Sequence, residues 1–155
     1  MDLLVRAFRD SKLDAELRVA GSGPDRGLLE SLAGGDKRIK FLGLVPEDDL
    51  CDFYNGLDMF VFPTAIEGYG LPPVEAMACR KPVVVLDDAV LPQEVRKHCL
   101  SVENLAELFD NINNIQHIIR LTDYDRSLRF AGLHSWKECV GQYIGLYNDI
   151  IKEGK

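Results

Sequence analysis

The sequence lacks any apolar run long enough to cross a membrane. Its uncharged stretches, such as Met59 to Ile66, fall far short of the roughly 20 apolar residues that a membrane helix needs. No secretory signal pattern is visible at the start of the chain. We therefore expect a cytoplasmic chain without a transmembrane segment, and a peripheral membrane association of a full-length protein stays open.

Cysteine is scarce, and its four positions do not follow Cys-x-x-Cys spacing. They are Cys51, Cys79, Cys99 and Cys139. This scatter favours reduced thiols, as in a cytosolic protein, over a disulfide framework or a zinc site. The three histidines are also not spaced as ligands on one helix face, so we expect no metal site.

Positive charge is in short supply as well. The chain has 18 lysines and arginines against 25 aspartates and glutamates, which gives a formal net charge of −7. A nucleic-acid surface is normally basic, so we expect no nucleic-acid partner. A polyphosphate ligand would have to be held by local backbone N–H groups and a few cations, not by a general field.

Helix and strand patterns alternate along the 155 residues, without internal repeats or linkers. This alternation predicts a single α/β domain over residues 1–155, a Rossmann-like parallel sheet with helices on both faces. The strands are expected at residues 16–20, 39–42, 59–62 and 83–86. The helices are expected at residues 3–8, 25–32, 46–55, 72–79, about 104–112 and 135–152.

The last of these helices carries an apolar stripe on one face, which includes Trp136, Tyr143 and Tyr147. Aromatic residues of these types are enriched at interfaces. We expect part of the stripe to be exposed and to support a homodimer. Complete packing of the stripe on the domain's own sheet is the alternative.

The segment from Glu67 to Glu75 is the most informative part of the sequence. Two carboxylates flank a loop with two glycines, Gly68 and Gly70, which can take positive φ and let the backbone approach a ligand. Pro72 is suited to the first helical position. Free N–H groups at a helix start attract anions such as a diphosphate. The segment therefore predicts a site for a phosphorylated, hydroxyl-rich molecule, with both glutamates facing one ligand.

The spacing of Glu67 and Glu75, with Gly-Tyr-Gly-Leu-Pro between them, resembles the E-x7-E signature of retaining, nucleotide-sugar-dependent glycosyltransferases. These are GT-B-fold enzymes of the large family 4, or group 1, type. Further landmarks occur in the family's order along nearly the whole chain. They are residues 17–24, 39–45, 58–63, 75–79, 81–85 and 135–136. The resemblance covers the nucleotide-binding, C-terminal half of such an enzyme.

The resemblance implies a role for each residue of the loop. Glu67 would be catalytic, contacting the donor sugar near the reacting centre, and Glu75 would bind the ribose hydroxyls. The residues between them that would bind the donor sugar and diphosphate are Gly68, Tyr69, Gly70 and Leu71. Other interpretations stay open: a solvated loop charge for Glu67, a helix-dipole partner for Glu75, and packing against a neighbouring helix for Tyr69.

Two further loops would bind the nucleotide by the same resemblance. One is Gly21-Ser22-Gly23, which could equally be a tight strand-to-helix turn, and the other contains Leu44 and Val45. Asp123-Tyr124-Asp125 matches the metal-binding Asp-x-Asp of a different glycosyltransferase fold. It lies between helical segments rather than after a strand, so we interpret it as helix capping.

The chain departs from the family pattern in three places. The basic Gly-Arg … Lys-Gly segment of the family would lie upstream, so we expect the first strand of this domain and the N-terminal acceptor domain to be absent. Arg80 replaces a usual glycine, and a left-handed backbone there would cost roughly 1–2 kcal/mol. Residues 88–94 replace a Gly-Gly loop.

The sequence thus predicts the donor-binding domain of a glycosyltransferase that acts with retention and without a cofactor or an obligatory metal. Its partners would be a nucleotide-sugar donor and an acceptor bound by the N-terminal domain. A non-catalytic nucleotide-binding or regulatory module with the same fold is the alternative, which the departures favour. The base, the sugar and the acceptor are not encoded in recognisable side chains.

Overall fold

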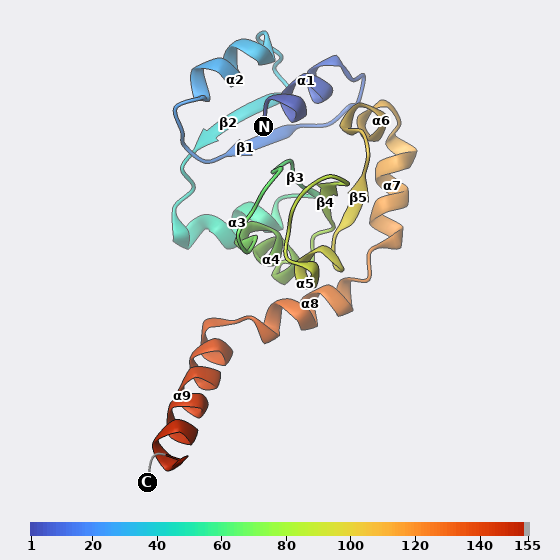
Figure 1. Ribbon diagram of the computed structural model, residues 1–155. Helices are drawn as coiled ribbons and strands as arrows, with labels where there is room; N and C mark the ends of the chain where they lie inside the picture. Colours follow the sequence, from blue (N-terminus) through green and yellow to red (C-terminus); the bar gives the residue numbers. More distant parts are fainter. Residues whose placement is uncertain (154–155) are drawn as a thin grey trace.

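The computed structural model describes residues 1–153 of the chain (Figure 1). Strands and helices alternate, as the sequence predicted. The strands are β1 Leu17–Ala20, β2 Ile39–Gly43, β3 Phe60–Phe62, β4 Val83–Leu86 and β5 Leu100–Val102. The helices before β4 are α1 Asp2–Asp10, α2 Arg26–Ala33, the 3-10 turn η1 Glu47–Asp49, α3 Leu50–Asn55 and α4 Leu71–Ala78. Those after it are α5 Gln93–Arg96, α6 Leu105–Asp110, α7 Ile112–Leu121, α8 Tyr124–Leu133 and α9 Trp136–Glu153.

All strand pairing within the described residues is parallel, but the strands form two sheets. The order is β1-β2 in one sheet and β3-β4-β5 in the other. Between β1 and β3 the ladder is interrupted, and apolar side chains of both strands line two cavities of about 360 and 370 Å³ there. The inner edges of β1 and β3 therefore face each other across this space without pairing.

Strand β4 is the centre of the larger sheet, because it has a neighbour on each side. Val83, Val84 and Val85 are each at most 1% exposed, as expected for a parallel strand covered on both faces. One hydrophobic cluster includes Val84 with Val5 and Phe8 of α1. The other includes Val83 and Val85 and the inner side of α4. Helices thus cover both faces of the sheet, which confirms the predicted fold class.

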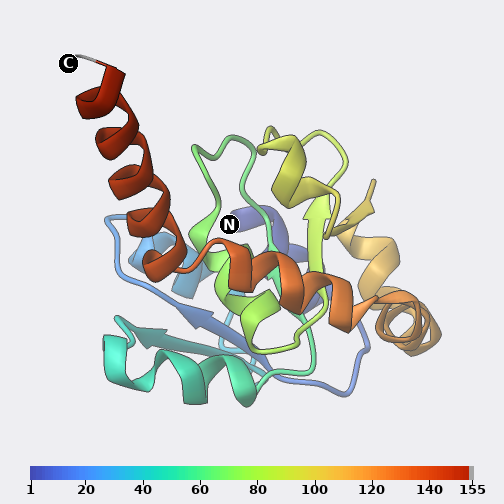
Figure 2. The same cartoon turned by 90° about the horizontal axis from the view of Figure 1, so that it is seen from below.

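The helices α4 and α8 pack against each other on one face of β3-β4-β5 (Figure 2). Ala76 and Met77 of α4 are completely buried there, and Ala131 of α8 joins the same cluster. On the other side of the molecule, α1 packs on α2 and α6, with Phe8 and Phe109 edge to face at 5.5 Å. These two helical layers fix the strand ends that carry the candidate site.

Several predicted elements differ from the structure. Strand β5 was not predicted, because three residues with Ser101 in the middle give no periodic signal. Asn104 caps α6 as expected, since its side chain accepts a hydrogen bond from Ala106 N at 2.8 Å. That helix ends earlier than predicted because the Asn111 side chain caps α7, accepting a hydrogen bond from Asn113 N at 2.9 Å. The predicted helix at residues 46–55 begins with the 3-10 turn, and α3 starts only at Leu50.

Asp123 is a helix cap, as the sequence predicted. Its Oδ1 accepts a hydrogen bond from Arg126 N at 2.9 Å at the start of α8. The following Asp125 makes an ion pair with Arg80 at the end of α4. The Asp-x-Asp sequence therefore joins α8 to α4. Within the described residues, no cluster of three or more His, Cys, Asp or Glu side chains has the arrangement of a metal site.

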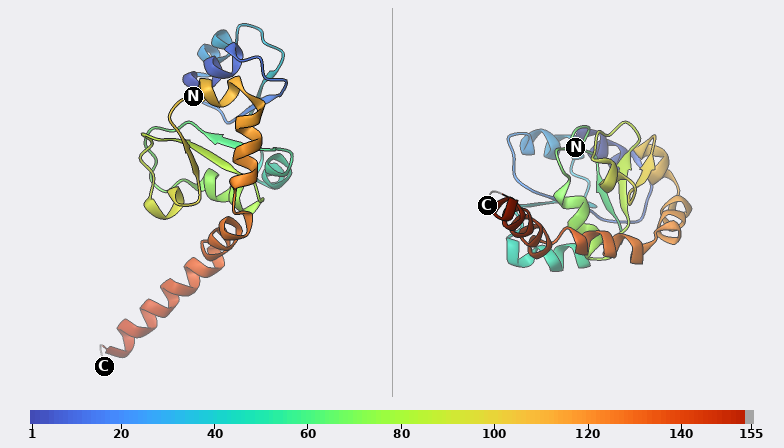
Figure 3. Two further views of the ribbon diagram at one scale, coloured as in Figure 1. Left: turned by 90° about the vertical axis from the view of Figure 1, so that its right-hand side faces the viewer. Right: turned by 60° about the horizontal axis from the view of Figure 1, so that its bottom comes forward.

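Helix α9 projects away from the rest of the structure (Figures 1 and 3). Its apolar stripe is exposed, from Trp136 at 83% to Ile151 at 61%, so the alternative of complete packing on the sheet is wrong. Residues Trp136, Val140, Tyr143, Tyr147 and Ile150 of the stripe follow each other at alternating intervals of four and three. No helix of the described part is both long and apolar enough to cross a bilayer.

Arg80, which the sequence analysis expected to replace a glycine, has a left-handed backbone. Its φ is 55°, and among the described residues it is the only one other than glycine with a positive φ. The β-carbon makes this conformation unfavourable. The Arg80 guanidinium reaches the Asp125 carboxylate, but both side chains are more than half exposed, so solvent weakens this ion pair.

We expect Arg80→Gly to be more stable than Arg80→Ala by about 1 kcal/mol. Both variants lose the ion pair with Asp125, so their difference isolates the strain of a β-carbon at positive φ. Urea denaturation of the two purified variants measures this difference. Equal free energies of unfolding would mean that the backbone relaxes away from the left-handed region when the guanidinium is removed.

Candidate functional site

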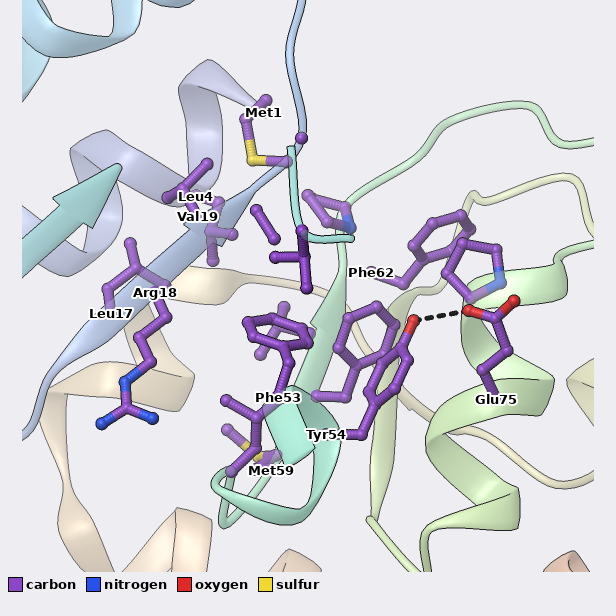
Figure 4. A pocket seen from close by; sticks show the side chains of 18 of the residues that line it. Met1, Leu4, Leu17, Arg18, Val19, Phe53, Tyr54, Met59, Phe62 and Glu75 are labelled. Carbon is purple, nitrogen blue, oxygen red and sulfur yellow. Dashed lines mark hydrogen bonds between the residues drawn. The ribbon is translucent and has the colours of Figure 1, made fainter. Parts of the chain in front are cut away.

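A cavity of about 360 Å³ opens where β1 and β3 end (Figure 4). In open parallel α/β sheets, ligands bind outside the carboxyl ends of the strands, and this cavity reaches that edge. Its walls are mostly apolar, with one carboxylate, that of Glu75, at the strand ends. The residues that line this edge include Gly21, Leu44, Val45, Pro63, Thr64, Pro72 and Glu75. Four of the predicted site residues thus come together: Gly21, Leu44, Val45 and Glu75.

Glu75 is held by a tyrosine from another helix. The hydroxyl of Tyr54 on α3 donates a hydrogen bond to Glu75 Oε2 at 2.8 Å (Figure 4). Tyr54 is only 5% exposed, and burial, followed by the bond to Glu75, raises the pKa of its phenol well above the usual 10.0. Glu75 itself is half-buried in α4. One oxygen of the carboxylate is therefore fixed by the protein, and no hydrogen bond to the other is seen within the described residues.

Helix α4 starts differently from the prediction. Gly70 is its N-cap with φ 86°, and Leu71 is the first helical residue, so that Pro72 and Pro73 are second and third. Proline carries no N–H, so this first turn offers the amides of Gly70 and Leu71 but none from the two prolines. Gly68 does not take positive φ, contrary to expectation. An anion at this helix start would thus meet fewer donors than the sequence suggested.

Glu67 lies at the other end of this loop. Its Oε1 accepts a bond from the neighbouring Gly68 N at 3.0 Å, and its own N–H donates to Val90 O at 3.0 Å. It does not line the cavity of Glu75. The predicted convergence of both glutamates on one ligand is therefore not seen in this cavity, which only Glu75 lines.

The segment that replaces the Gly-Gly loop packs directly on the signature loop. Val90 pairs with Ile66 in a parallel bridge, and the Val90 N–H donates to Ala65 O at 2.7 Å. Next to it, Leu91 lies close to Gly70, where an added β-carbon would be 3.5 Å from Leu91 Cδ2. Side chains thus occupy the approach to the loop on this side.

Tyr69 packs against the end of α8. Its ring centroid is 6.1 Å from that of His134, and the side chain belongs to the cluster beneath α4. Burial, with the nearby Glu94 carboxylate, raises the pKa of the phenol. Of the two interpretations of Tyr69, the structure shows packing against a neighbouring helix.

The Gly21-Ser22-Gly23 turn connects β1 to α2. Gly21 lines the Glu75 cavity and also a third cavity of about 360 Å³, which lies next to α2. Ser22 and Gly23 line only this third cavity. The Gly21 N–H donates to Gly43 O at 2.7 Å, which ties this turn to the loop of Leu44 and Val45. The residues Gly68, Tyr69, Gly70 and Leu71 line neither cavity.

Sequence reasoning missed Tyr54. It lies within the predicted helix at residues 46–55, and in the structure it packs edge to face on Phe53 and Phe60. No sequence signal pairs its hydroxyl with a glutamate 21 positions later. The one hint is the residue type itself: a buried tyrosine usually has a hydrogen-bond partner for its hydroxyl, whereas a phenylalanine would fill the same space without one.

The order of landmarks in the sequence and the site at the strand ends agree with one protein family. Residues 1–117 match the family described as Glycosyl transferases group 1, which is most of the chain. The chain belongs to the group 1 glycosyltransferases. The resemblance drawn from the E-x7-E spacing is thereby confirmed.

Individual glycosyltransferases match over different lengths. The chain is 34% identical over 121 residues to the O-antigen chain mannosyltransferase B of Escherichia coli, an alignment that covers 70% of this chain and 30% of that protein. The chain thus spans less than half the length of this relative.

Solved structures show the same fold at lower identity. Anabaena HepE in complex with UDP and glucose superposes with a TM-score of 0.71 at 19% identity, covering 95% of this chain and 44% of that one. The C-terminal domain of the group 1 family protein LpcC from Francisella tularensis has a TM-score of 0.66 at 21% identity, covering 86% and 77%.

Proposed function

We propose that this chain binds a nucleotide-sugar donor and, joined to an N-terminal domain, transfers the glycosyl group to an acceptor with retention. The observation that carries the proposal is the Glu75 carboxylate, oriented by Tyr54 toward a cavity at the carboxyl ends of the strands. Membership of the group 1 glycosyltransferases supports it, and so does the UDP in the complex of HepE.

Each part of the donor has a chemically suitable partner. The ribose diol donates to Glu75, because a carboxylate with a free oxygen accepts strong hydrogen bonds from hydroxyl groups. The nucleobase lies by Gly21, Leu44 and Val45, where backbone groups can meet it. The diphosphate takes the N–H groups of Gly70 and Leu71, at the positive end of the α4 dipole.

Glu67 is the proposed catalytic residue. The family resemblance supports this role, since Glu67 is the first glutamate of the E-x7-E spacing that ends at Glu75. The charge of Glu67 would support the positive charge that develops as the glycosidic bond breaks. The reaction needs no cofactor and no obligatory metal in this proposal, and the donor is a UDP-, GDP- or ADP-sugar.

The remaining parts of the enzyme come from outside these residues. We propose that the N-terminal domain binds the acceptor and that a further parallel strand fills the space between β1 and β3. The facing unpaired edges and the two apolar cavities between them support the added strand. The cytoplasmic location stays a prediction from the cysteine pattern.

A non-catalytic nucleotide-binding module is the second candidate. The packing of Leu91 close to Gly70 favours it, because a side chain stands where a Gly-Gly loop would let a donor sugar approach. Both candidates share the nucleotide site, so they differ in whether the complete protein transfers a sugar.

We expect Glu75→Ala to weaken binding of a nucleoside diphosphate by about 1.5–3 kcal/mol, because the ribose loses its charged acceptor. Calorimetric titration of UDP, GDP and ADP into the purified chain measures the affinities. Glu107→Ala is the control, since Glu107 is an exposed glutamate on α6, away from the cavity. Unchanged affinity in Glu75→Ala would reduce Glu75 to a partner of the helix dipole.

We expect the 155 residues alone to transfer no sugar. In this proposal the N-terminal domain supplies the acceptor site, so these residues by themselves neither position an acceptor nor exclude water from the reaction. Incubation with labelled UDP-, GDP- and ADP-sugars and simple glycoside acceptors tests this, with the complete protein as positive control. Transfer by the short chain at a rate comparable with the complete protein would contradict it.

We expect the chain to self-associate through the apolar stripe of α9. The stripe is exposed over its length, and an apolar surface of that kind is unusual on a monomer. Sedimentation velocity of the wild type should show a dimer that Tyr147→Glu abolishes. Gln142→Glu adds the same charge on another face of α9 and should leave the dimer intact. A wild type that stays monomeric at high concentration would show that the stripe serves another partner.

A further inference from the structure

The contact between Tyr54 and Glu75 joins two helices that are separate in sequence. Tyr54 belongs to α3, and Glu75 to the α4 helix that follows β3. The hydrogen bond between them, 2.8 Å from the phenol oxygen to Oε2, lies in the wall of the cavity at the strand ends (Figure 4). The hydroxyl of the buried Tyr54 thus donates its hydrogen bond to Glu75, the residue proposed to accept hydrogen bonds from the ribose.

The phenol cannot easily move away from this position. Its ring is packed edge to face between Phe53 at 5.3 Å and Phe60 at 5.5 Å, measured between ring centroids. Beside it, the C-terminal end of α3 is tied down by Lys81, whose Nζ donates to Asn55 O at 2.9 Å. A fixed donor therefore meets the end of a glutamate side chain, which by itself has many rotamers.

The Tyr54 phenol is always the donor of this hydrogen bond. Burial and the Glu75 carboxylate raise the pKa of Tyr54, so the hydroxyl keeps its proton throughout the physiological range. The carboxylate is then always the acceptor of this bond.

We propose that Tyr54 is a positioning residue for donor binding, which holds Glu75 Oε2 so that Oε1 accepts hydrogen bonds from the ribose hydroxyls. This inference rests on the proposed function. In this inference the site prefers a ribose nucleotide to a 2′,3′-dideoxyribose nucleotide because Tyr54 orients Glu75. Tyr54 itself does not contact the ribose.

The test compares ribose and dideoxyribose nucleotides. UDP, GDP and ADP, each beside its 2′,3′-dideoxy counterpart, are titrated calorimetrically into wild type and Tyr54→Phe. We expect Tyr54→Phe to bind the ribose form about twofold to tenfold more weakly, the range for one lost hydrogen bond. Binding of the dideoxy form should not change, because that form makes no bond to Glu75.

A matched control removes a tyrosine hydroxyl elsewhere. Tyr124 on α8 donates a bond to Ile119 O at 3.0 Å, so Tyr124→Phe loses one partly buried hydroxyl bond outside the cavity. We expect it to retain the full preference for ribose. In the Glu75→Ala background, Tyr54→Phe should have no further effect on the affinity, since two residues that act as a unit are not additive.

The outcomes separate this inference from the proposed function. A Tyr54→Phe variant that keeps the ribose preference, or that loses affinity equally for both forms of the nucleotide, would overturn the positioning role and leave the proposed function intact. A wild type that binds none of the nucleotides, or that does not distinguish ribose from dideoxyribose, would overturn the proposed function and this inference with it. Thermal melts of each variant establish that the protein remains folded.

Discussion

Burial of β4 between β3 and β5 is the constraint on which the rest of the structure depends. Val83, Val84 and Val85 exclude water from both faces of the sheet and belong in turn to the two hydrophobic clusters. A parallel strand can be buried in this way only if helices cover both faces. The chain therefore returns from each strand to the next along a helix, and every strand ends at the same edge. That edge is where the candidate site lies.

The site depends on this arrangement more than on any single loop. Tyr54 lies on α3 and Glu75 on α4, the helices that come before and after β3 in the sequence. Both side chains line the cavity, where the Tyr54 hydroxyl donates to the Glu75 carboxylate. The apolar packing of Tyr54 on Phe53 and Phe60 makes the position of its hydroxyl a property of the core. If Glu75 binds the donor as proposed, core packing and ligand recognition are coupled at this residue pair.

The sequence signature and the structure emphasise different parts of the loop. The spacing of Glu67 and Glu75 indicated the family, and the family match confirms it. The structure adds that Pro72 and Pro73 remove two N–H donors from the first turn of α4, and that Leu91 packs close to Gly70. A diphosphate would meet few protein donors in an acidic chain. In the proposed complex, the hydrogen bonds between the ribose and Glu75 consequently contribute more to donor binding than the contacts of the diphosphate do.

The sequence by itself determined the α/β class, most strand and helix positions, the cap at Asp123 and the family. These depend on periodicity, capping chemistry and local spacing, which a linear chain displays directly. Only the tertiary structure decided that β1 and β3 do not pair, that Tyr69 packs toward His134, that the stripe of α9 is exposed, and that Tyr54 binds Glu75. Each of these depends on contacts between residues distant in sequence. Local patterns cannot encode such contacts, because they say which face of an element is apolar but not which partner it will meet.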